Sequence, residues 1–333
     1  MADLTEKETE EILGRKPQQQ LYYKLGDYEY STNSKERVLS GISRLDELVK
    51  GFEMGCITIW TGLTNSGKTT LMTMITKQTI EQKEKVFYFN GEQTKDDFKN
   101  NLYKQSVNKD YITAKRYKQT NIVDYFVDNT KAQELEAIYG NNLFLYNNNM
   151  KRTIDFLLEA MNEVRTKYGV RVFILDNFMQ IDTTSSDEYR EQKDIMEKLR
   201  TFAVNNNVHI HLVAHPRKVD KLQTRITIYD VLGSSNLVNK AYNVISIIRT
   251  DGLNEDDYEY KRLQKLMLRE GYDIAQSSSI LEILKTKGER CGVVGLIYNP
   301  LTKTYKEEGR TTTEEDIRKM DRDMRAGAEC PFL

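Results

Sequence analysis

The sequence has few cysteines and none of the long apolar runs that mark membrane-spanning proteins. Its 3 cysteines, Cys56, Cys291 and Cys330, stand far apart and include no CxxC pair. This spacing argues against a disulfide framework or a zinc site and favours a reducing compartment. No apolar run reaches the ~18 residues that a membrane span needs, and the acidic start MADLTEKETEE is not a secretory signal. We therefore expect no membrane partner.

An excess of charge of one sign is also missing. The chain carries 49 lysines and arginines against 50 acidic residues, for a formal net charge of −1. Contact with a nucleic-acid backbone would therefore need a local concentration of cations rather than a global basic field. With 39% hydrophobic residues, 30% charged residues and only 4 prolines, the composition is that of a globular protein.

The hydrophobic pattern divides the chain into three segments. Residues 1–37 contain a short predicted helix at 4–15 and a polar linker, and residues 309–333 form a charged tail that we expect to be flexible. Residues 38–308 alternate strands with helices, with a segment at 95–140 that is helical in pattern. Strands are predicted at 56–62, 85–92, 142–147, 170–177, 208–215 and 243–250, with a closing pair at 277–287 and 291–300. This alternation predicts an α/β fold whose mostly parallel sheet has helices on both faces.

A glycine-rich turn separates the first long strand from the next helix. The stretch TGLTNSGKTT at 61–70 contains Gly62-x-x-x-x-Gly67-Lys68-Thr69, the P-loop pattern, with both required flanks. Backbone N–H groups and the helix N-terminus would bind phosphates, Lys68 would reach the β- and γ-phosphates, and Thr69 would ligate Mg²⁺. The predicted cofactors are ATP, or another NTP, and Mg²⁺. The residues predicted to bind them here are Gly62, Thr64, Asn65, Ser66, Gly67, Lys68, Thr69 and Thr70.

Two carboxylates end apolar strands that follow the P-loop. VFILD places Asp176 at a strand end, where an acid can hold Mg²⁺ together with Thr69. FYFNGE ends in Glu92, which should face the γ-phosphate because ligands of such sheets lie at the carboxyl ends of the strands. There Glu92 can act as general base on the attacking water. The alternative for Glu92 is an ordinary solvated acid.

The stretch NVHIHLVAHPRKVDK at 207–221 joins an apolar strand to a basic loop. The strand runs to His215, and the loop cations are Arg217, Lys218 and Lys221. A strand end that touches the nucleotide, followed by cations for a phosphate backbone, can couple the two ligands. An ordinary solvated loop is the alternative.

A metal site on the same strand is the other alternative. It would use His209, His211 and His215. His209 and His211 share one face of the strand, but no cysteine or acidic cluster accompanies them in the sequence. Zinc sites combine such ligands, so this pattern disfavours a metal.

In their order along residues 38–307, these motifs resemble the RecA-like motor domain of the hexameric replicative DNA helicases, which include bacterial DnaB, the phage primase–helicases and mitochondrial Twinkle. SGISRLDELVKGFEMGCITIWTG is similar to the family's entry into the P-loop, FNGEQ to its catalytic-glutamate strand and LDNFMQID to its Walker B strand. LVAHPRK and DVLGSSNLVNKAYNVISIIR are most similar to the Twinkle and phage branch, and LEILKTKGERCGVVGLIYNP resembles the final hairpin. The resemblance implies a RecA-like P-loop NTPase with a C-terminal β-hairpin.

The resemblance also implies an ATP-dependent replicative helicase. Its homo-hexameric ring would couple NTP hydrolysis at subunit interfaces to movement along single-stranded DNA in the channel and to duplex unwinding, with primase or polymerase as further partners. His215 would sense the γ-phosphate. The residues implied to contact DNA are Arg217, Lys218, Lys221, Gly233, Ser234 and Ser235. The implied compartment is the cytoplasm of a bacterium or a phage-infected host, ahead of the mitochondrial matrix.

The nucleobase and the neighbouring subunit have implied contacts of their own. Arg249 and Tyr298 match the positions that sandwich the base, although hairpin packing is the alternative for Tyr298. Where the family carries a Lys and then an Arg that reaches into the neighbour's ATP, this chain has Lys285-Thr286-Lys287 and a later Arg290. Lysine lacks the guanidinium fork, so either Lys287 acts less efficiently or Arg290 substitutes for it.

Two alternatives to a helicase stay open. One is a RecA-type recombinase or mediator that forms open filaments, and the other is a KaiC-like signalling ATPase that forms rings without DNA. The HPRK and GSSN segments favour the helicase over both. Residues 1–37 are too few for a primase, a zinc-binding module or a helical collar, so we expect no primase activity. The resemblance implies that the helix at 4–15 docks on the adjacent subunit.

Overall fold

A computed structural model of the chain describes residues 24–25, 35–117, 122–183, 187–216, 226–231 and 235–309. The chain separates into two compact units, residues 1–35 and 36–333. Everything below concerns the described residues of the second unit. The predicted helix at 4–15 and the predicted tail beyond Gly309 lie outside the described residues.

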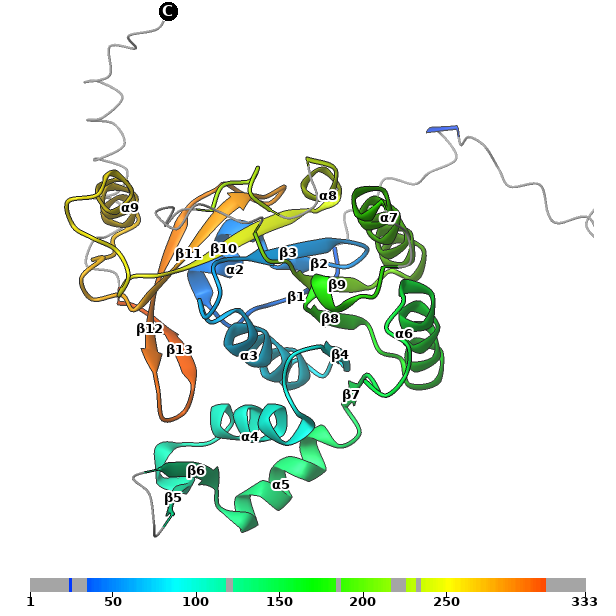
Figure 1. The fold of residues 1–333 in the computed structure, drawn as a ribbon, viewed down its shortest axis with the longest axis horizontal. Coiled ribbons are helices and arrows are strands. Elements are labelled where there is room, and N and C mark those ends of the chain that lie inside the picture. Colours follow the sequence, from blue (N-terminus) through cyan, green and yellow to red (C-terminus); the bar gives the residue numbers. More distant parts are fainter. Residues whose placement is uncertain are drawn as a thin grey trace, which may run out of the picture. The chain divides into compact units, whose positions relative to one another are not determined.

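The second unit is built on a nine-stranded sheet in the order β13-β12-β11-β10-β3-β9-β8-β4-β7 (Figure 1). Pairing is parallel from β10 to β7 and antiparallel from β10 to β13. The strands are β3 (Ile57–Thr61), β4 (Val86–Asn90), β7 (Leu143–Leu145), β8 (Val172–Asp176), β9 (His209–Val213), β10 (Asn243–Arg249), β11 (Ser279–Lys285), β12 (Val293–Asn299) and β13 (Thr304–Glu307). The predicted mostly parallel sheet with a closing hairpin is therefore confirmed, and β13 extends the hairpin by one strand that was not predicted.

Helices cover both faces of the sheet (Figure 1). They are α2 (Ser43–Val49), α3 (Lys68–Glu81), α4 (Lys95–Gln105), α5 (Asn129–Tyr139), α6 (Ile154–Tyr168), α7 (Glu188–Asn206), α8 (Ser235–Lys240) and α9 (Tyr258–Arg269). Local signals set several of their ends. The Thr94 hydroxyl accepts a hydrogen bond from the Asp97 N–H at the start of α4, and α6 ends at Gly169 in a left-handed conformation with φ 74°. In the described part of the chain, no helix is long and apolar enough to cross a membrane.

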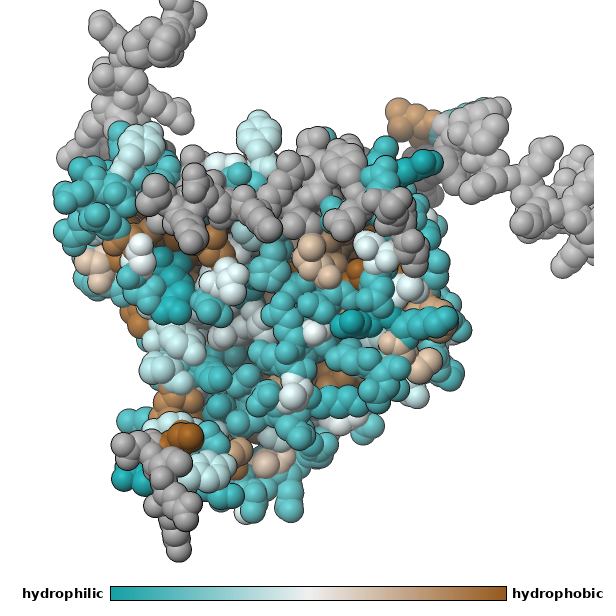
Figure 2. Space-filling model, in the orientation of Figure 1, coloured by the Kyte–Doolittle hydropathy of each residue, from teal (hydrophilic) through white to brown (hydrophobic). Residues whose placement is uncertain are grey.

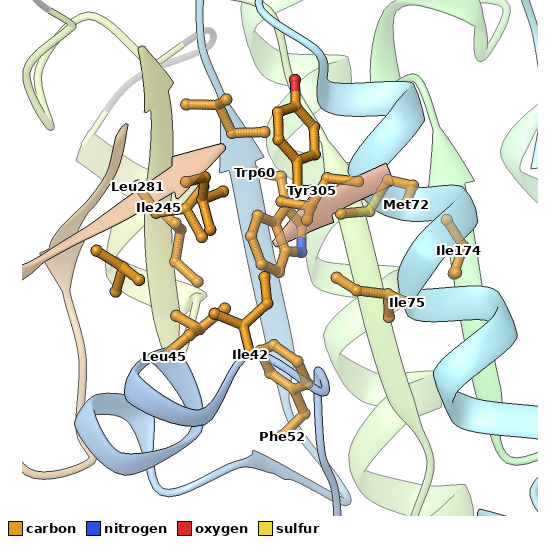
Figure 3. Close-up of a cluster of buried hydrophobic side chains, with 14 of the residues drawn as sticks. Ile42, Leu45, Phe52, Trp60, Met72, Ile75, Ile174, Ile245, Leu281 and Tyr305 are labelled. Carbon is orange, nitrogen blue, oxygen red and sulfur yellow. The ribbon is translucent and has the colours of Figure 1, made fainter. Parts of the chain in front are cut away.

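The core has one layer on each side of the sheet, because successive strand side chains point to opposite faces. Ile57 and Ile59 of β3 belong to the cluster that α6 and α7 cover. Trp60 belongs to the other cluster, together with Met72 and Ile75 of α3 and residues of α2 (Figure 3). The two layers pack against both faces of the central strands, so the strand ends that carry the predicted site residues are held in place.

Two of the three histidines are core residues. His209 and His211 are fully buried on β9; the Glu53 carbonyl oxygen lies 2.8 Å from Nδ1 of His209, and Nε1 of Trp60 donates to Nδ1 of His211 at 3.1 Å. Burial lowers the pKa of His209 to about 4 and lowers that of His211 well below its ordinary value. No group of three metal-binding side chains occurs among the described residues.

The segment at 95–140 is only partly helical, so the prediction that it is helical is wrong for its central part. Between α4 and α5 lies a two-stranded antiparallel hairpin, β5 (Ile112–Arg116) and β6 (Val123–Val127). The sequence signal is the β-branched and aromatic run VDYFV, which suits a strand better than a helix. Large hydrophobic side chains are exposed here, among them Tyr125 and Phe126. The space-filling view shows hydrophobic surface at the lower left, where Figure 1 places this hairpin (Figure 2).

Candidate active site

The P-loop connects β3 to α3 in a conformation that needs its glycines. Gly62 has φ 148° and Gly67 has φ 97°, and Asn65 between them also adopts a positive φ of 62°. A Cβ atom on Gly62 would lie 2.5 Å from the Ile247 carbonyl oxygen, and one on Gly67 would overlap the Tyr305 hydroxyl. The loop therefore needs small residues at both positions, as the predicted phosphate cradle does.

Lys68 is held inside this loop. Its side chain is buried, and Nζ donates to the carbonyl oxygens of Gly62 at 2.9 Å and Leu63 at 2.8 Å. Burial lowers the Lys68 pKa to about 8, although Asp176 and Glu92 nearby oppose the shift. The ammonium group therefore stays mostly protonated at pH 7, as a phosphate ligand requires.

Asp176 lies at the end of β8 with 3% of its surface exposed. The Tyr88 hydroxyl donates to Oδ2 at 2.9 Å, and the Thr69 side chain forms a second hydrogen bond with the carboxylate. Burial raises the Asp176 pKa to about 6 against these hydrogen bonds. A hydroxyl and a carboxylate side by side are oxygen donors of the kind that Mg²⁺ prefers, so Thr69 and Asp176 fit the predicted ion. Tyr88 was not predicted, because one tyrosine inside an apolar strand carries no functional signal.

Glu92 follows β4 and lies beside the end of β9. Nδ2 of Asn177 donates to its Oε1 atom, and Nε2 of His215 lies 3.5 Å from the same oxygen. The His215 pKa is lowered, first by burial and then by the positive charge of Lys68. The imidazole is therefore mostly neutral at pH 7. The carboxylate and the imidazole, predicted from two separate strand ends, thus lie in contact.

These side chains line one cavity of about 590 Å³ at the carboxyl ends of the parallel strands. We call it the phosphate cavity. Its lining residues are Thr64, Asn65, Gly67, Lys68, Thr69, Thr70, Glu92, Gln93, Asp176 and His215. Ser66 is buried and lines a smaller cavity on the other side of the loop. Apart from Gly62 and Ser66, the predicted phosphate and metal residues therefore converge on one space, and Gln93 joins them unpredicted.

A second cavity, of about 200 Å³, adjoins the first across the P-loop. We call it the base cavity. Asn65, Gly67 and Thr70 line both cavities. The other lining residues are Arg249, Asp251, Ser278, Ser279, Tyr298 and Tyr305. The predicted pair Arg249 and Tyr298 thus lies next to the phosphate cavity, as a base contact requires.

Comparison with known proteins agrees with this geometry. The family described as DnaB-like helicase C terminal domain matches residues 38–307. The chain belongs to this family. A Twinkle homolog of the chloroplast and mitochondrion from Arabidopsis thaliana is 27% identical over 101 residues, which make up 29% of this chain and 14% of that protein.

Two solved structures have the same fold. One is a DnaB-like replicative helicase, described together with its interactions with primase, with a TM-score of 0.64 and 15% identity over 82% of this chain and 62% of that one. The other is described as an ATPase domain, and it gives a TM-score of 0.64 and 16% identity over 82% of this chain and 91% of that domain. The predicted RecA-like fold and helicase family are confirmed. The chain spans less than two thirds of the length of the Arabidopsis protein and of the first helicase.

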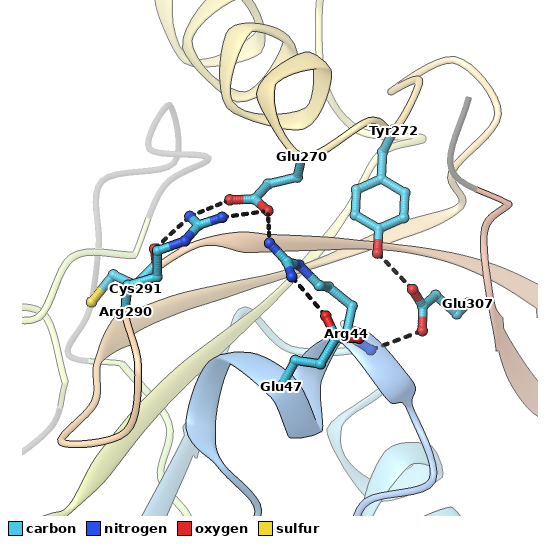
Figure 4. A network of polar contacts seen from close by, with 7 residues as sticks. All are labelled: Arg44, Glu47, Glu270, Tyr272, Arg290, Cys291 and Glu307. Atoms are coloured by element: carbon cyan, nitrogen blue, oxygen red, sulfur yellow. Dashed lines mark hydrogen bonds and ion pairs between the residues drawn. The ribbon is translucent and has the colours of Figure 1, made fainter. Parts of the chain in front are cut away.

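The three cations near the last hairpin of this helicase-family chain have different surroundings. Nζ of Lys285 donates to the main-chain oxygens that end α8, those of Val238, Asn239 and Ala241, at 2.7 to 3.2 Å. Arg290 donates to Glu270 at 2.5 and 3.0 Å, and the same buried carboxylate accepts from Arg44 at 2.6 Å (Figure 4). Nζ of Lys287 lies over the Tyr242 ring, 5.8 Å from its centre. The chain therefore uses Lys285 and Arg290 in contacts of its own.

The predicted DNA contacts mostly lie beyond what the structure describes. Arg217, Lys218, Lys221, Gly233 and Ser234 are outside the described residues, and Ser235 is described only as the first residue of α8. Pro216 and Val231 form an isolated antiparallel bridge. The end of β9 and the approach to α8 therefore lie side by side next to His215.

Proposed function

We propose that the chain is the NTP-hydrolysing motor of a replicative DNA helicase, which assembles as a homo-hexameric ring and moves along single-stranded DNA. The observation that carries this proposal is the convergence of Lys68, Thr69, Glu92, Asp176 and His215 on one cavity, in a chain of the DnaB-like helicase family. A nucleotide site of this kind hydrolyses phosphoanhydrides through positioned charges.

Each side chain in the phosphate cavity has a proposed role. Lys68 binds the β- and γ-phosphates, and Thr69 with Asp176 would hold Mg²⁺, which neutralises the charge of the triphosphate when it is bound. Glu92 accepts the proton of the attacking water. Asn177 donates to Glu92 Oε1, which keeps the carboxylate oriented toward the cavity.

His215 is proposed to report nucleotide occupancy to the DNA. It contacts Glu92 on one side and precedes Pro216, whose bridge to Val231 closes the base of the predicted DNA loop. A movement of the imidazole on γ-phosphate binding would therefore shift the loop that carries Arg217, Lys218 and Lys221. Those cations are proposed to hold the DNA backbone.

Lys287 is proposed as the residue that reaches the neighbouring subunit's nucleotide. Arg290 is held by Glu270 within its own chain, and Lys285 is held by the end of α8, so either would have to break hydrogen bonds in order to act in trans. Lys287 would only leave the face of the Tyr242 ring.

Subunit mixing tests the assignment of Lys287. Doping wild-type protein with Lys287→Ala subunits should lower ATPase activity more steeply than the fraction of mutant. Each mutant subunit would leave its neighbour's site incomplete, and one incomplete site would interrupt coordinated hydrolysis around the ring. Arg290→Ala subunits serve as the matched comparison. A strictly proportional loss for Lys287→Ala, with a steep loss for Arg290→Ala, would transfer the role to Arg290.

The deciding experiment measures ATP hydrolysis with and without a single-stranded oligonucleotide, together with release of a labelled strand from a forked duplex. Stimulation with strand release is expected, and Glu92→Gln should abolish both. Stimulation without release would favour a recombinase-type ATPase. Hydrolysis with no response to DNA would favour a signalling ATPase of the KaiC kind.

Partners and location are proposed from the relatives alone. Primase is a proposed partner because one structural neighbour is described with its interactions with primase; polymerase is proposed from the family resemblance. We propose the cytoplasm of a bacterium or phage-infected cell as the compartment, although the Arabidopsis relative is a chloroplast and mitochondrial protein. Pull-down with primase and polymerase would test the partners.

A further inference from the structure

The base cavity contains an ion pair that the motifs do not explain. Arg249 ends β10, and Asp251 stands two residues later in the turn that follows. Nε of Arg249 donates to Oδ1 of Asp251 at 3.0 Å, and Nη2 donates to Oδ2. The carboxylate therefore binds one whole edge of the guanidinium group, a two-point contact that holds its plane as well as its charge.

The other edge of the guanidinium group faces the P-loop. Nη1 of Arg249 lies 3.5 Å from the Asn65 carbonyl oxygen. The guanidinium plane is thus held between the turn and the P-loop, and the half-exposed side chain lines the base cavity. Tyr298 and Tyr305, whose ring centres are 5.1 Å apart, line the same cavity.

The turn that carries Asp251 is itself anchored to the sheet. The Thr250 hydroxyl donates to the Ser277 carbonyl oxygen at 2.6 Å, and the Leu253 N–H donates to the Thr250 carbonyl oxygen at 3.0 Å. The backbone on either side of Asp251 is therefore held in place, whereas the long Arg249 side chain, half exposed, depends on its partners for its orientation.

We propose that Asp251 is a positioning residue that holds the Arg249 guanidinium flat as one wall of the nucleobase site. This inference rests on the proposed nucleotide function. Asp251 itself would not touch the phosphates or the reacting water; it would act on nucleotide affinity through Arg249. The ligand class is a nucleoside triphosphate whose base stacks on the guanidinium plane.

The sign of the effect distinguishes this role from simple electrostatics. A carboxylate beside a polyanionic ligand repels it, so removing the charge of Asp251 should tighten triphosphate binding if charge alone matters. Loss of the wall should instead weaken binding. Asp251→Asn changes the charge and the two-point contact at nearly constant size, and Asp256→Asn changes the charge of the same loop outside the cavity.

The test is titration of the full chain, with Mg²⁺ present, with a nonhydrolysable ATP analogue and with tripolyphosphate, which lacks a base. We expect Asp251→Asn to raise the dissociation constant of the analogue by about two- to fivefold, the range of an exposed cation–π contact. The dissociation constant of tripolyphosphate should not rise, because that ligand has no base to lose and the removed carboxylate can only have repelled it. Asp256→Asn should change neither. In steady-state hydrolysis the variant should raise KM by the same factor and lower kcat much less.

A double variant tests the route through Arg249. If Asp251 acts only by orienting that side chain, Asp251→Asn in an Arg249→Ala background should cause no further loss. Additive losses, an equal loss for tripolyphosphate, or tighter binding of the analogue would each overturn the inference. So would a changed ratio of ATP to GTP affinity, since a wall that contacts only the base face does not read the base edges. A wild-type chain that binds no nucleotide at all would instead overturn the proposed function, and the inference with it.

Discussion

The phosphate cavity and the base cavity share the P-loop as a common wall, yet they are built in different ways. Lys68 and Asp176 in the phosphate cavity are almost fully buried and held by hydrogen bonds of 2.8 and 2.9 Å. In the base cavity, the side chains of Arg249 and Asp251 are 51% and 61% exposed. The buried site fixes charges in a low-dielectric environment, where they act strongly on chemistry, whereas the exposed site can contribute only modest binding energy. Changes in the first should therefore alter kcat, and changes in the second should alter KM.

The largest effect should come from Glu92→Gln in the phosphate cavity. The amide cannot accept the proton of the attacking water, so kcat should fall by about 10²- to 10⁴-fold, while binding of the ATP analogue persists. Phosphate release and titration measure the two quantities. A similar fall in analogue affinity would show that Glu92 serves binding rather than proton transfer, and would blur the contrast between the cavities.

The scaffold beneath both cavities should be sensitive to acid. The folded-state pKa of His209 is about 4, against an ordinary value of 6.5, so the unfolded chain takes up the proton first as the pH falls. The contribution of His209 to the free energy of unfolding is complete above pH 6.5, and it falls by about 3 kcal/mol in total as the pH approaches 4. His211, lowered in the same direction, adds to the loss.

Urea unfolding at pH 7.5 and pH 5.5, followed by fluorescence of the single tryptophan, measures this dependence. His209→Asn keeps a donor for the Glu53 carbonyl oxygen without a titrating group, so its stability should depend less on pH than that of the wild type. Burial raises the pKa of Asp46 and Asp176 to about 6, so these groups stabilise the folded chain as the pH falls. They are the same in the wild type and in His209→Asn, so their effect cancels when the two are compared. Equal pH dependence in the two proteins would refute the assignment.

Tyr88→Phe should test the support of the proposed metal ligand. Its hydroxyl donates to Asp176 within the buried end of the sheet, and loss of such an outer partner typically costs about 10- to 100-fold in metal affinity or activity. The Mg²⁺ concentration that gives half-maximal ATPase activity should therefore rise. Tyr146→Phe is a matched control, since that hydroxyl bonds to the Lys151 carbonyl oxygen away from both cavities. An unchanged Mg²⁺ requirement would limit the role of Tyr88 to packing.

The smallest effect should come from the base cavity. Tyr298→Ala removes a ring that lines the base cavity together with Arg249. KM for ATP should therefore rise by about two- to fivefold, as expected for loss of one exposed aromatic contact, with a much smaller change in kcat. Tyr298→Phe should behave like the wild type because it keeps the ring. A large fall in kcat for Tyr298→Ala would mean that the two cavities do not divide binding from chemistry.

The predictions from sequence succeeded where the signal is local and failed where it depends on distant parts of the chain. The P-loop is one contiguous stretch with a local backbone requirement, so its position and conformation were predictable. The hairpin at β5 and β6 was predicted as helix because its strands are mostly exposed on both faces, so they lack the alternation of buried and exposed residues that marks a strand. Helix α9 and strand β13 were missed, and with β13 went Tyr305, whose contact with Gly67 joins the hairpin to the P-loop.

By itself the sequence determined the fold class, the P-loop and the strand-end residues Glu92, Asp176 and His215. Each of these depends on a short pattern, and parallel strands bring their carboxyl ends to one edge of the sheet. Only the tertiary structure decided the contact of His215 with Glu92, the support of Asp176 by Tyr88, the retention of Arg290 by Glu270 and the ion pair of Arg249 with Asp251. These contacts depend on which strands are neighbours and on how the turns and side chains between them are arranged, and neither is determined by local periodicity.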